Sequence, residues 1–357
     1  MRRGESGFSL LELMIALVIV ASVLAAASTF FIGTVRQYKV QTKITESNVE
    51  GVIGLELLRQ DVESLGFGLP WNGFPFAYTE RSGVHASITA LNETPNAPRA
   101  VVSINNAPSG VALNGSDYLV IRSARVGMDN AAGKWTTLSS TGGKRNWSSQ
   151  DDDLLNTDYV TVLAPGTVAS DRQSLVGTST YALTGGLVPT ESFQTNIVYG
   201  IGAAAPVRPF NRADYFIADN TTNPPYSRPR HCASNTGVLV KAAIAHDVPG
   251  TPTLFPLLDC VADMKVVYGL DTDANGLVDN TTNTVAGLTA ANLRAQLLEL
   301  RIHILAQVGQ RDDSFNYPAT TVSVGSGGFI DNVDVSGFRN YRWKVYNIVV
   351  RPKNLGI

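Results

Sequence analysis

The chain is poor in the residues that build catalytic centres. It has two cysteines and four histidines among 357 residues. It contains no paired H-x-x-x-H or H-E-x-x-H histidines, no G-x-S-x-G elbow, no Walker loop and no G-x-G-x-x-G fingerprint. These are the local signatures of zinc hydrolases, serine hydrolases and nucleotide-binding enzymes. We therefore expect a protein that is not an enzyme.

Charge is also scarce. Asp, Glu, Lys and Arg make up 16% of the chain, and the formal net charge is -2. Such a chain has no general basic field for binding nucleic acid, so no nucleic-acid partner is expected. Its many Gly, Ser, Thr and Asn residues are typical of a turn-rich, exported β protein.

The two cysteines, Cys232 and Cys260, do not form a C-x-x-C pair. In an exported protein the simplest prediction is a disulfide between them. Closing a loop of that length would stabilise the fold by roughly 3–4 kcal/mol. The alternative is two unpaired, buried thiols.

Proline and charge are both missing from a long N-terminal stretch. No proline precedes Pro70, and no charged residue occurs from Leu13 to Gly33, whereas Arg2 and Arg3 lie upstream. The 21 residues from 13 to 33 would span about 30 Å as a helix, the thickness of a bilayer core. The arginines would keep the N-terminus in the cytoplasm. We predict a transmembrane helix at 13–33, with a secretory signal as the alternative.

The helical pattern continues beyond the apolar run. Apolar residues recur there at 3-4-3 spacing, which places them on one helical face: Leu55, Leu58, Val62 and Leu65. The stop signals Gly66, Gly68 and Pro70 follow. We predict one helix from about Phe8 to Leu65, whose second half is amphipathic and packs on a globular head.

A short motif, GFSLLEL, runs from Gly7 to Leu13 at the start of the apolar run. It resembles the processing site of type IV prepilins and type II secretion pseudopilins. In that family a prepilin peptidase cleaves after the glycine and methylates the new N-terminal phenylalanine. The resemblance implies a leader at 1–7, cleavage between Gly7 and Phe8, and N-methylation of Phe8.

The motif also contains Glu12, which would be the fifth residue of the mature chain. A carboxylate near the bilayer core costs up to roughly 3 kcal/mol and is retained when it finds a partner. In the family the matching glutamate pairs with the N-terminal amine of a neighbouring subunit. The resemblance therefore implies an assembly role for Glu12. The alternative is a carboxylate that merely lies at the headgroups.

Both ends of the chain are similar to PilW-type minor pilins. The similar segments are GLELLRQDVESLGF, from Gly54 to Phe67, and YRWKVYNIVVRPKNLGI, from Tyr341 to Ile357. The resemblance implies a single-pass inner-membrane subunit with a periplasmic head, which joins other pilins in an extracellular pilus and helps to initiate or cap its assembly. A tip adhesin on the same stalk and a type II secretion pseudopilin are the alternatives.

The rest of the chain predicts an α+β fold, in which the N-terminal helix (8–66) packs on a mainly antiparallel β head (67–357). Seven segments rich in Val, Ile and Tyr are predicted strands: 117–123, 158–165, 195–202, 237–245, 263–270, 298–308 and 343–350. Alternation between 300 and 308 predicts a half-buried strand. One helix is expected at 288–297, and the polar stretches 125–157 and 205–235 are expected to be loops.

One loop has the spacing of a calcium site. Side-chain oxygens occupy positions 1, 3, 5 and 9 of the pattern, with Gly276 at position 6 and the Leu277 carbonyl as a further ligand: Asp271, Asp273, Asn275 and Asp279. Position 12 is Thr282 where an EF-hand has glutamate, so an EF-hand is excluded. We expect a free-standing calcium loop of modest affinity. An Asx-rich hairpin turn without metal is the alternative.

Overall fold

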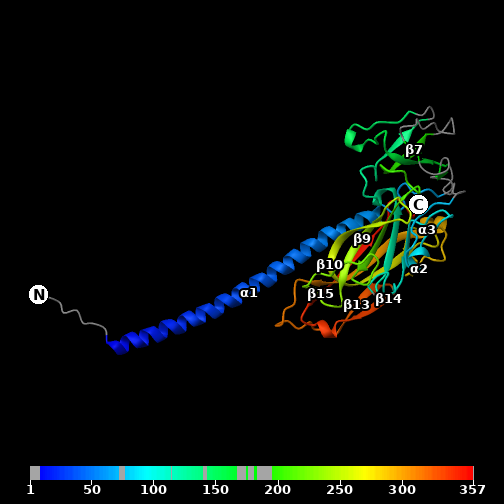
Figure 1. Ribbon diagram of the computed structural model, residues 1–357. Helices are drawn as coiled ribbons and strands as arrows, with labels where there is room; N and C mark the ends of the chain where they lie inside the picture. Colours follow the sequence, from blue (N-terminus) through cyan, green and yellow to red (C-terminus); the bar gives the residue numbers. More distant parts are fainter. Residues whose placement is uncertain are drawn as a thin grey trace.

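The protein consists of one long helix and a β-rich head. The computed structural model describes residues 9–71, 77–113, 115–139, 143–166, 174–175, 181–182 and 195–356. The helix, α1, spans Leu10–Glu63, and its N-terminal half extends away from the head (Figure 1). The predicted α+β class, a long helix packed on a mostly antiparallel head, is confirmed.

The N-terminal half of α1 is apolar on every side and makes no contact that buries it. Its most apolar 18-residue window has a mean hydropathy of 2.6, and none of that window is buried. By length and composition this half can cross a membrane. The predicted helix limits agree with the observed ones to within two residues at the C-terminal end, and Phe8 lies outside the described residues.

The C-terminal part of α1 packs against the head. Its buried face consists of Gly51, Gly54, Leu55, Leu58 and Val62. Gly54 is required there, because a Cβ at this position would lie 1.7 Å from the carbonyl oxygen of Leu257. The missing side chain lets the helix backbone approach the main sheet closely.

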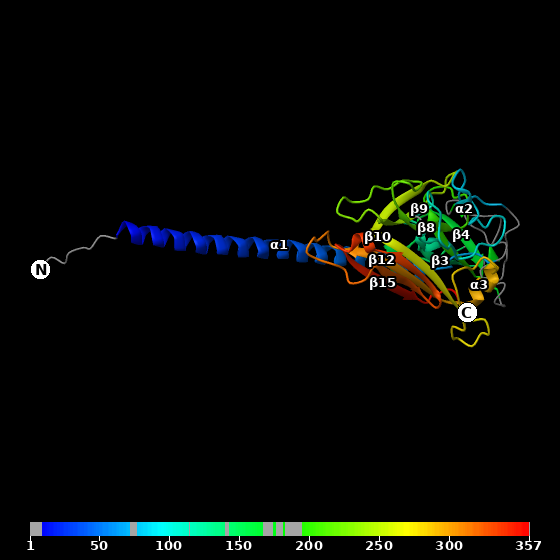
Figure 2. The ribbon, with the colours of Figure 1, turned by 90° about the horizontal axis from the view of Figure 1, so that it is seen from below.

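The main sheet has eight antiparallel strands, in the order β1-β2-β8-β9-β10-β12-β15, with β11 paired to β10. Their bounds are β1 Val101–Ile104, β2 Tyr118–Ser123, β8 Asn211–Ala218, β9 Gly237–Ile244, β10 Pro252–Leu270, β11 Asn280–Thr282, β12 Leu297–Val308 and β15 Arg342–Val350. Strands β10, β12 and β15 contact α1, as Figure 2 shows. The core is formed between the sheet and the apolar stripe of the helix.

A second sheet lies at the end of the head that is distant from the N-terminus (Figure 1). Its strands are β3 Trp135–Leu138, β4 Tyr159–Ala164, β5 Ser174–Leu175, β6 Tyr181–Ala182 and β7 Asn196–Gly202. A separate hairpin consists of β13 Thr321–Ser326 and β14 Phe329–Asp334. The short helices are α2 Ala86–Thr89, α3 Ala290–Gln296, η1 Ala124–Val126, η2 Gln150–Asp152 and η4 Ser336–Phe338.

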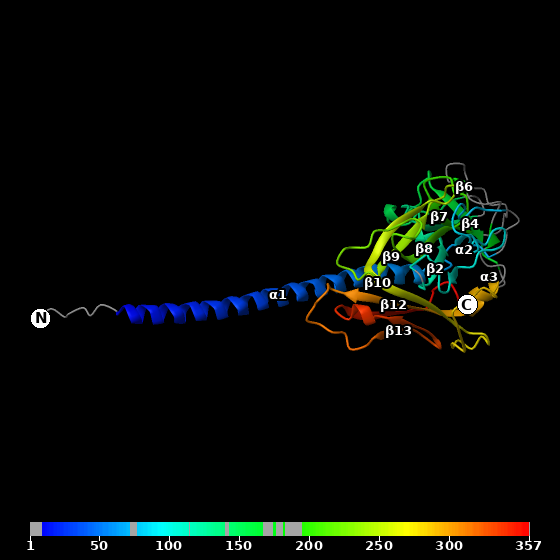
Figure 3. The same ribbon diagram turned by 60° about the horizontal axis from the view of Figure 1, so that its bottom comes forward.

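Two predictions about the head are wrong. The strand at 300–308 is buried on both faces, because the β13–β14 hairpin covers the side that faces away from the core (Figure 3). The stretch 205–235 is not only a loop, since it contains β8, a central strand in which all eight residues are buried. The stretch 125–157 likewise contains β3.

A loop of the head runs back along α1. Residues 309–315 follow β12, and a Cβ on Gly309 would lie 3.0 Å from the Ile44 side chain. A cavity of about 460 Å³ lies between this loop and the helix, and it is lined by residues that include Gln37, Val40 and Asp312. The head therefore reaches α1 well before the buried stripe that begins at Gly51.

Candidate functional site

The N-terminus of α1 is the first candidate site. Gly7 and Phe8 lie outside the described residues, so the predicted cleavage and methylation remain predictions. Ser9 precedes the helix, and its backbone N–H donates to Oε2 of Glu12 over 3.2 Å. Glu12 is exposed and stabilises the first turn of its own helix, as acidic residues do near helix N-termini. Its pairing with an amine of another chain stays a prediction.

Large apolar side chains cover the first half of α1 and are exposed, including Leu13 at 60%, Leu17 at 64% and Phe30 at 77%. A monomeric soluble protein rarely exposes an apolar surface of this extent. This surface needs lipid or other helices to cover it. The exposed apolar half of α1 is therefore consistent with membrane anchoring.

Polar contacts fix the direction of α1 relative to the head. Asp61 accepts a hydrogen bond from Lys241 Nζ over 2.6 Å and another from the Tyr215 hydroxyl. Glu63 forms an ion pair with Lys353 Nζ at 2.7 Å. The Lys353 hydrogen bond lowers the pKa of Glu63. These contacts therefore join the C-terminal end of α1 to β8, β9 and the C-terminal segment of the chain.

Residues 2–28 match the family model described as the prokaryotic N-terminal methylation motif. The chain carries the N-terminus of a type IV prepilin or pseudopilin. This match covers the motif around Gly7 and most of the predicted membrane span, and it does not extend into the head. No curated protein and no solved structure matches the chain. The head of this pilin-like protein is therefore interpreted from its own structure.

The predicted calcium loop joins β10 to β11 as a hairpin connection. Asp271, Asp273 and Asp279 place carboxylate oxygens within 4.8 Å of one another. Desolvation and the hydrogen bond with Asp271 raise the pKa of Asp273. This convergence suits a hard divalent cation, which prefers oxygen ligands.

The loop also provides partners of its own. Asp271 accepts the Gly276 backbone N–H over 2.7 Å, and Asp279 accepts the Thr272 backbone N–H over 3.0 Å. Asn275 Oδ1 accepts the Leu277 backbone N–H over 2.8 Å. These bonds are those of an Asx-rich turn. Three carboxylates are thus brought together, whereas the ligand roles of Asn275 and of the Leu277 carbonyl stay predictions.

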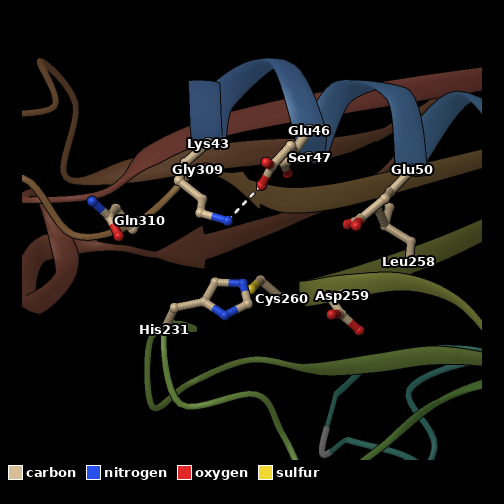
Figure 4. A pocket seen from close by; sticks show the side chains of 10 residues that line it. All are labelled: Lys43, Glu46, Ser47, Glu50, His231, Leu258, Asp259, Cys260, Gly309 and Gln310. Carbon is tan, nitrogen blue, oxygen red and sulfur yellow. Dashed lines mark hydrogen bonds and ion pairs between the residues drawn. The ribbon is translucent and has the colours of Figure 1, made fainter. Parts of the chain in front are cut away.

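The structure contains a disulfide between Cys232 and Cys260, with a Cα–Cα distance of 5.0 Å. It lies beside a cavity of about 190 Å³ between α1 and β10 (Figure 4). The helix contributes Lys43, Glu46, Ser47 and Glu50 to the lining, and the head contributes His231, Leu258, Asp259, Cys260, Gly309 and Gln310. The covalent link therefore holds the head together where it meets the amphipathic half of the helix.

Sequence reasoning missed a buried network of charges in the pilin-like head. Glu80 accepts from Arg122 Nε at 2.8 Å and from Arg212 Nη1 at 3.0 Å. Asp214 accepts from Arg212 Nε at 2.7 Å and from Arg81 Nη1 at 3.3 Å. The side chains of Glu80, Arg122, Arg212 and Asp214 are 0% exposed. The sequence signal for this network was the presence of two arginines, Arg122 and Arg212, within apolar, strand-like segments. Every charge has a partner, so the network is structural.

Proposed function

We propose that the protein is a minor pilin, a structural subunit that helps to initiate or cap type IV pilus assembly through α1. The observation that carries this proposal is the methylation motif at the start of a helix whose apolar half extends, uncovered, from a folded head. In this proposal the helix first anchors the protein in the inner membrane, with the head in the periplasm. It then leaves the bilayer to pack against the helices of other pilins.

In this proposal the negative charge of Glu12 sets the position of neighbouring subunits relative to one another. Within its own chain the carboxylate bonds the Ser9 N–H through Oε2. A carboxylate has about four acceptor sites, so it can also bind an amine of a neighbouring subunit. Prepilin peptidase creates that amine at Phe8. A charge pair formed in a low-dielectric helix bundle would set the register between neighbouring subunits.

The test uses Glu12→Ala, with the exposed Glu56→Ala as a matched control on the same helix. We expect Glu12→Ala to remain in the membrane fraction but to be lost from sheared pili, because removing the carboxylate removes the pairing and not the apolar span. Glu56→Ala should enter pili normally. Incorporation of Glu12→Ala at the wild-type level would refute the pairing. Mass spectrometry that finds Met1 at the mature N-terminus would refute the prepilin assignment itself.

A second candidate function is ligand binding by the head, as in a tip adhesin. It is favoured by an aromatic pair at the edge of the second sheet, formed by Trp135 of β3, which is 40% exposed, and Trp147 of the loop that follows, with 4.9 Å between their ring centroids. We expect Trp135→Ala to reduce adherence without reducing pilus number if this pair binds a ligand. An unchanged adherence would leave assembly as the function.

A pseudopilin of a type II secretion system would share the same motif, and secretion assays of a deletion strain separate the two systems.

We also propose that the loop from Asp271 to Asp279 binds Ca²⁺. The support is the convergence of the three carboxylates, whose mutual repulsion a cation would relieve. Calcium at 100 times its dissociation constant should stabilise the head by about 2.7 kcal/mol. This gain should disappear in Asp273→Asn and persist in the control Asp313→Asn, an exposed aspartate outside the loop. Thermal unfolding with and without a chelator measures it, and an equal gain in both variants would exclude the loop.

A further inference from the structure

A histidine lies directly beside the disulfide. Nε2 of His231 is 3.8 Å from Sγ of Cys232. The ligating atoms of His231, Cys232 and Cys260 all lie within 4.8 Å of one another. His231 is exposed, whereas Cys232 and Cys260 are 6% and 2% exposed. Solvent therefore reaches the imidazole, and the two sulfurs lie behind it.

The distance between Cys232 Sγ and His231 Nε2 suits a tetrahedral soft-metal site, whereas the two sulfurs are bonded to each other in the disulfide and must move to about 3.8 Å apart after reduction. Zinc binds cysteine sulfur at about 2.3 Å and histidine nitrogen at about 2.0–2.1 Å, which gives a sulfur–nitrogen separation of about 3.6 Å at tetrahedral angles. The observed 3.8 Å between Cys232 Sγ and His231 Nε2 is close to that value. Once the disulfide is reduced, two thiolates and one imidazole would form a three-ligand set that favours zinc over calcium or magnesium.

The surroundings supply room and further oxygen ligands. The cavity of about 190 Å³ in front of the disulfide is lined by Glu50 from α1 and Asp259 from β10 (Figure 4). The pairing of β10 with β9 is interrupted between Leu258 and Val261, so Asp259 and Cys260 lie in a bulge. A bulge leaves these residues outside the regular ladder, so their side chains can adjust without breaking it. Lys43 Nζ forms an ion pair with Glu46 Oε2 at 2.5 Å, and Glu50 takes no part in that pair.

We propose that reduction of the Cys232–Cys260 disulfide creates a binding site for a soft divalent cation, with His231 as the third protein ligand. One molecule of a dithiol reductant gives two electrons and two protons to the S–S bond and closes to its own cyclic disulfide. The product has two cysteine thiols. Each thiol loses its proton when its sulfur binds the cation, because the thiolate is the ligand. Water or a cavity carboxylate occupies the fourth position.

The consequence is that two different links can hold the same part of the head. In the oxidised chain a covalent bond joins β10 to the segment before β9. In the reduced chain the cation joins the same two residues and adds His231. The region beside α1 thus stays fixed in both redox states, provided that the cation is present.

The experiment uses the full chain in detergent micelles, reduced with dithiothreitol, desalted without oxygen and titrated with Co²⁺. We expect one equivalent to bind with thiolate-to-cobalt charge-transfer absorption in the reduced chain, and no such absorption in the oxidised chain. The calcium loop cannot produce this band, because it contains no sulfur. Excess Zn²⁺ should abolish the band by displacing cobalt.

The matched variants are His231→Ala and His85→Ala, which remove exposed histidines inside and outside the site. We expect His231→Ala to weaken Co²⁺ binding by at least roughly tenfold, and His85→Ala to leave it unchanged. A reduced chain without the band, or equal affinity in both variants, would overturn the proposal. If the reduced chain loses its circular dichroism, recovery on adding Co²⁺ together with the band supports the site, and failure to recover overturns it.

Discussion

Replacing Glu80 by glutamine tests whether the buried charge network stabilises the head. The Glu80 carboxylate is fully buried and accepts from two guanidinium groups, those of Arg122 and Arg212. Its other oxygen accepts the backbone N–H of Glu93 over 2.8 Å. Glutamine keeps the shape of the side chain but removes its charge. Both arginines would then lose their shared counter-ion in the interior.

Removing one member of a buried ion pair typically costs about 3–5 kcal/mol, because it leaves an uncompensated buried charge. Here one carboxylate serves two arginines, although Arg212 keeps Asp214 at 2.7 Å. We therefore expect Glu80→Gln to lower the free energy of unfolding by about 3–5 kcal/mol. The exposed pair Lys43–Glu46 provides the control, since its side chains are 55% and 52% exposed. Glu46→Gln should cost less than about 0.5 kcal/mol.

Urea unfolding of the full chain in micelles, followed by tryptophan fluorescence, measures both variants. A loss below about 1 kcal/mol for Glu80→Gln would refute the assigned role of the network. The effect should also depend on pH. Burial opposes the charge of Glu80, but Arg122 and Arg212 outweigh it and lower its pKa. The stabilisation is therefore present above the pKa of an unfolded glutamate, about 4.3, and the difference between wild type and variant should shrink as the pH falls below it.

Two further predictions concern close packing and a buried acid. Gly54→Ala should displace or detach α1 from the head, because the new Cβ would lie 1.7 Å from the Leu257 oxygen. Limited proteolysis near residue 54 should then be faster than in the wild type. An unchanged rate of cleavage would contradict the close approach of the helix to the sheet. Burial, followed by the charges of Asp331 and Asp117, raises the pKa of Asp263 to about 7. The contribution of Asp263 to stability should therefore fall as the pH rises from about 4 towards 7, and Asp263→Asn should reduce the slope, part of which remains because burial raises the pKa of Asp117 to about 6. Equal pH profiles of the two proteins in urea unfolding would count against it.

The helix could be predicted from sequence because each of its signals is local. The absence of proline before Pro70, the uncharged run at 13–33 and the stripe from Leu55 to Leu65 all depend on residues that are close together in the chain. The methylation motif is equally local. The seven predicted strands all correspond to strands in the structure, because β-branched and aromatic residues mark them.

The interior of the head could not be predicted in the same way. The sequence NRADYFIA of β8 begins with polar residues, which indicate a loop, yet Arg212 and Asp214 neutralise each other inside the sheet. The polar face of β12 looked solvent-exposed, but the β13–β14 hairpin covers it. There His303 bonds Asn347 Oδ1 at 2.6 Å and Ser326 Oγ at 2.9 Å. Both outcomes depend on partners that are distant in the chain, so no local period reveals them.

The return of loop 309–315 along α1 limits the space between the head and the lipid. With residues 13–33 in the bilayer, as proposed, Ile44 lies about 16 Å beyond the hydrocarbon edge at 1.5 Å per residue. Headgroups fill about 5–8 Å of that distance. The cavity under the loop reaches further still, because Gln37, which lines it, lies only about 6 Å beyond that edge, within the headgroup layer. On the side of α1 that carries this loop, the head and the headgroups therefore leave no room for another protein segment, so a partner that binds the helix at this level must approach from another side.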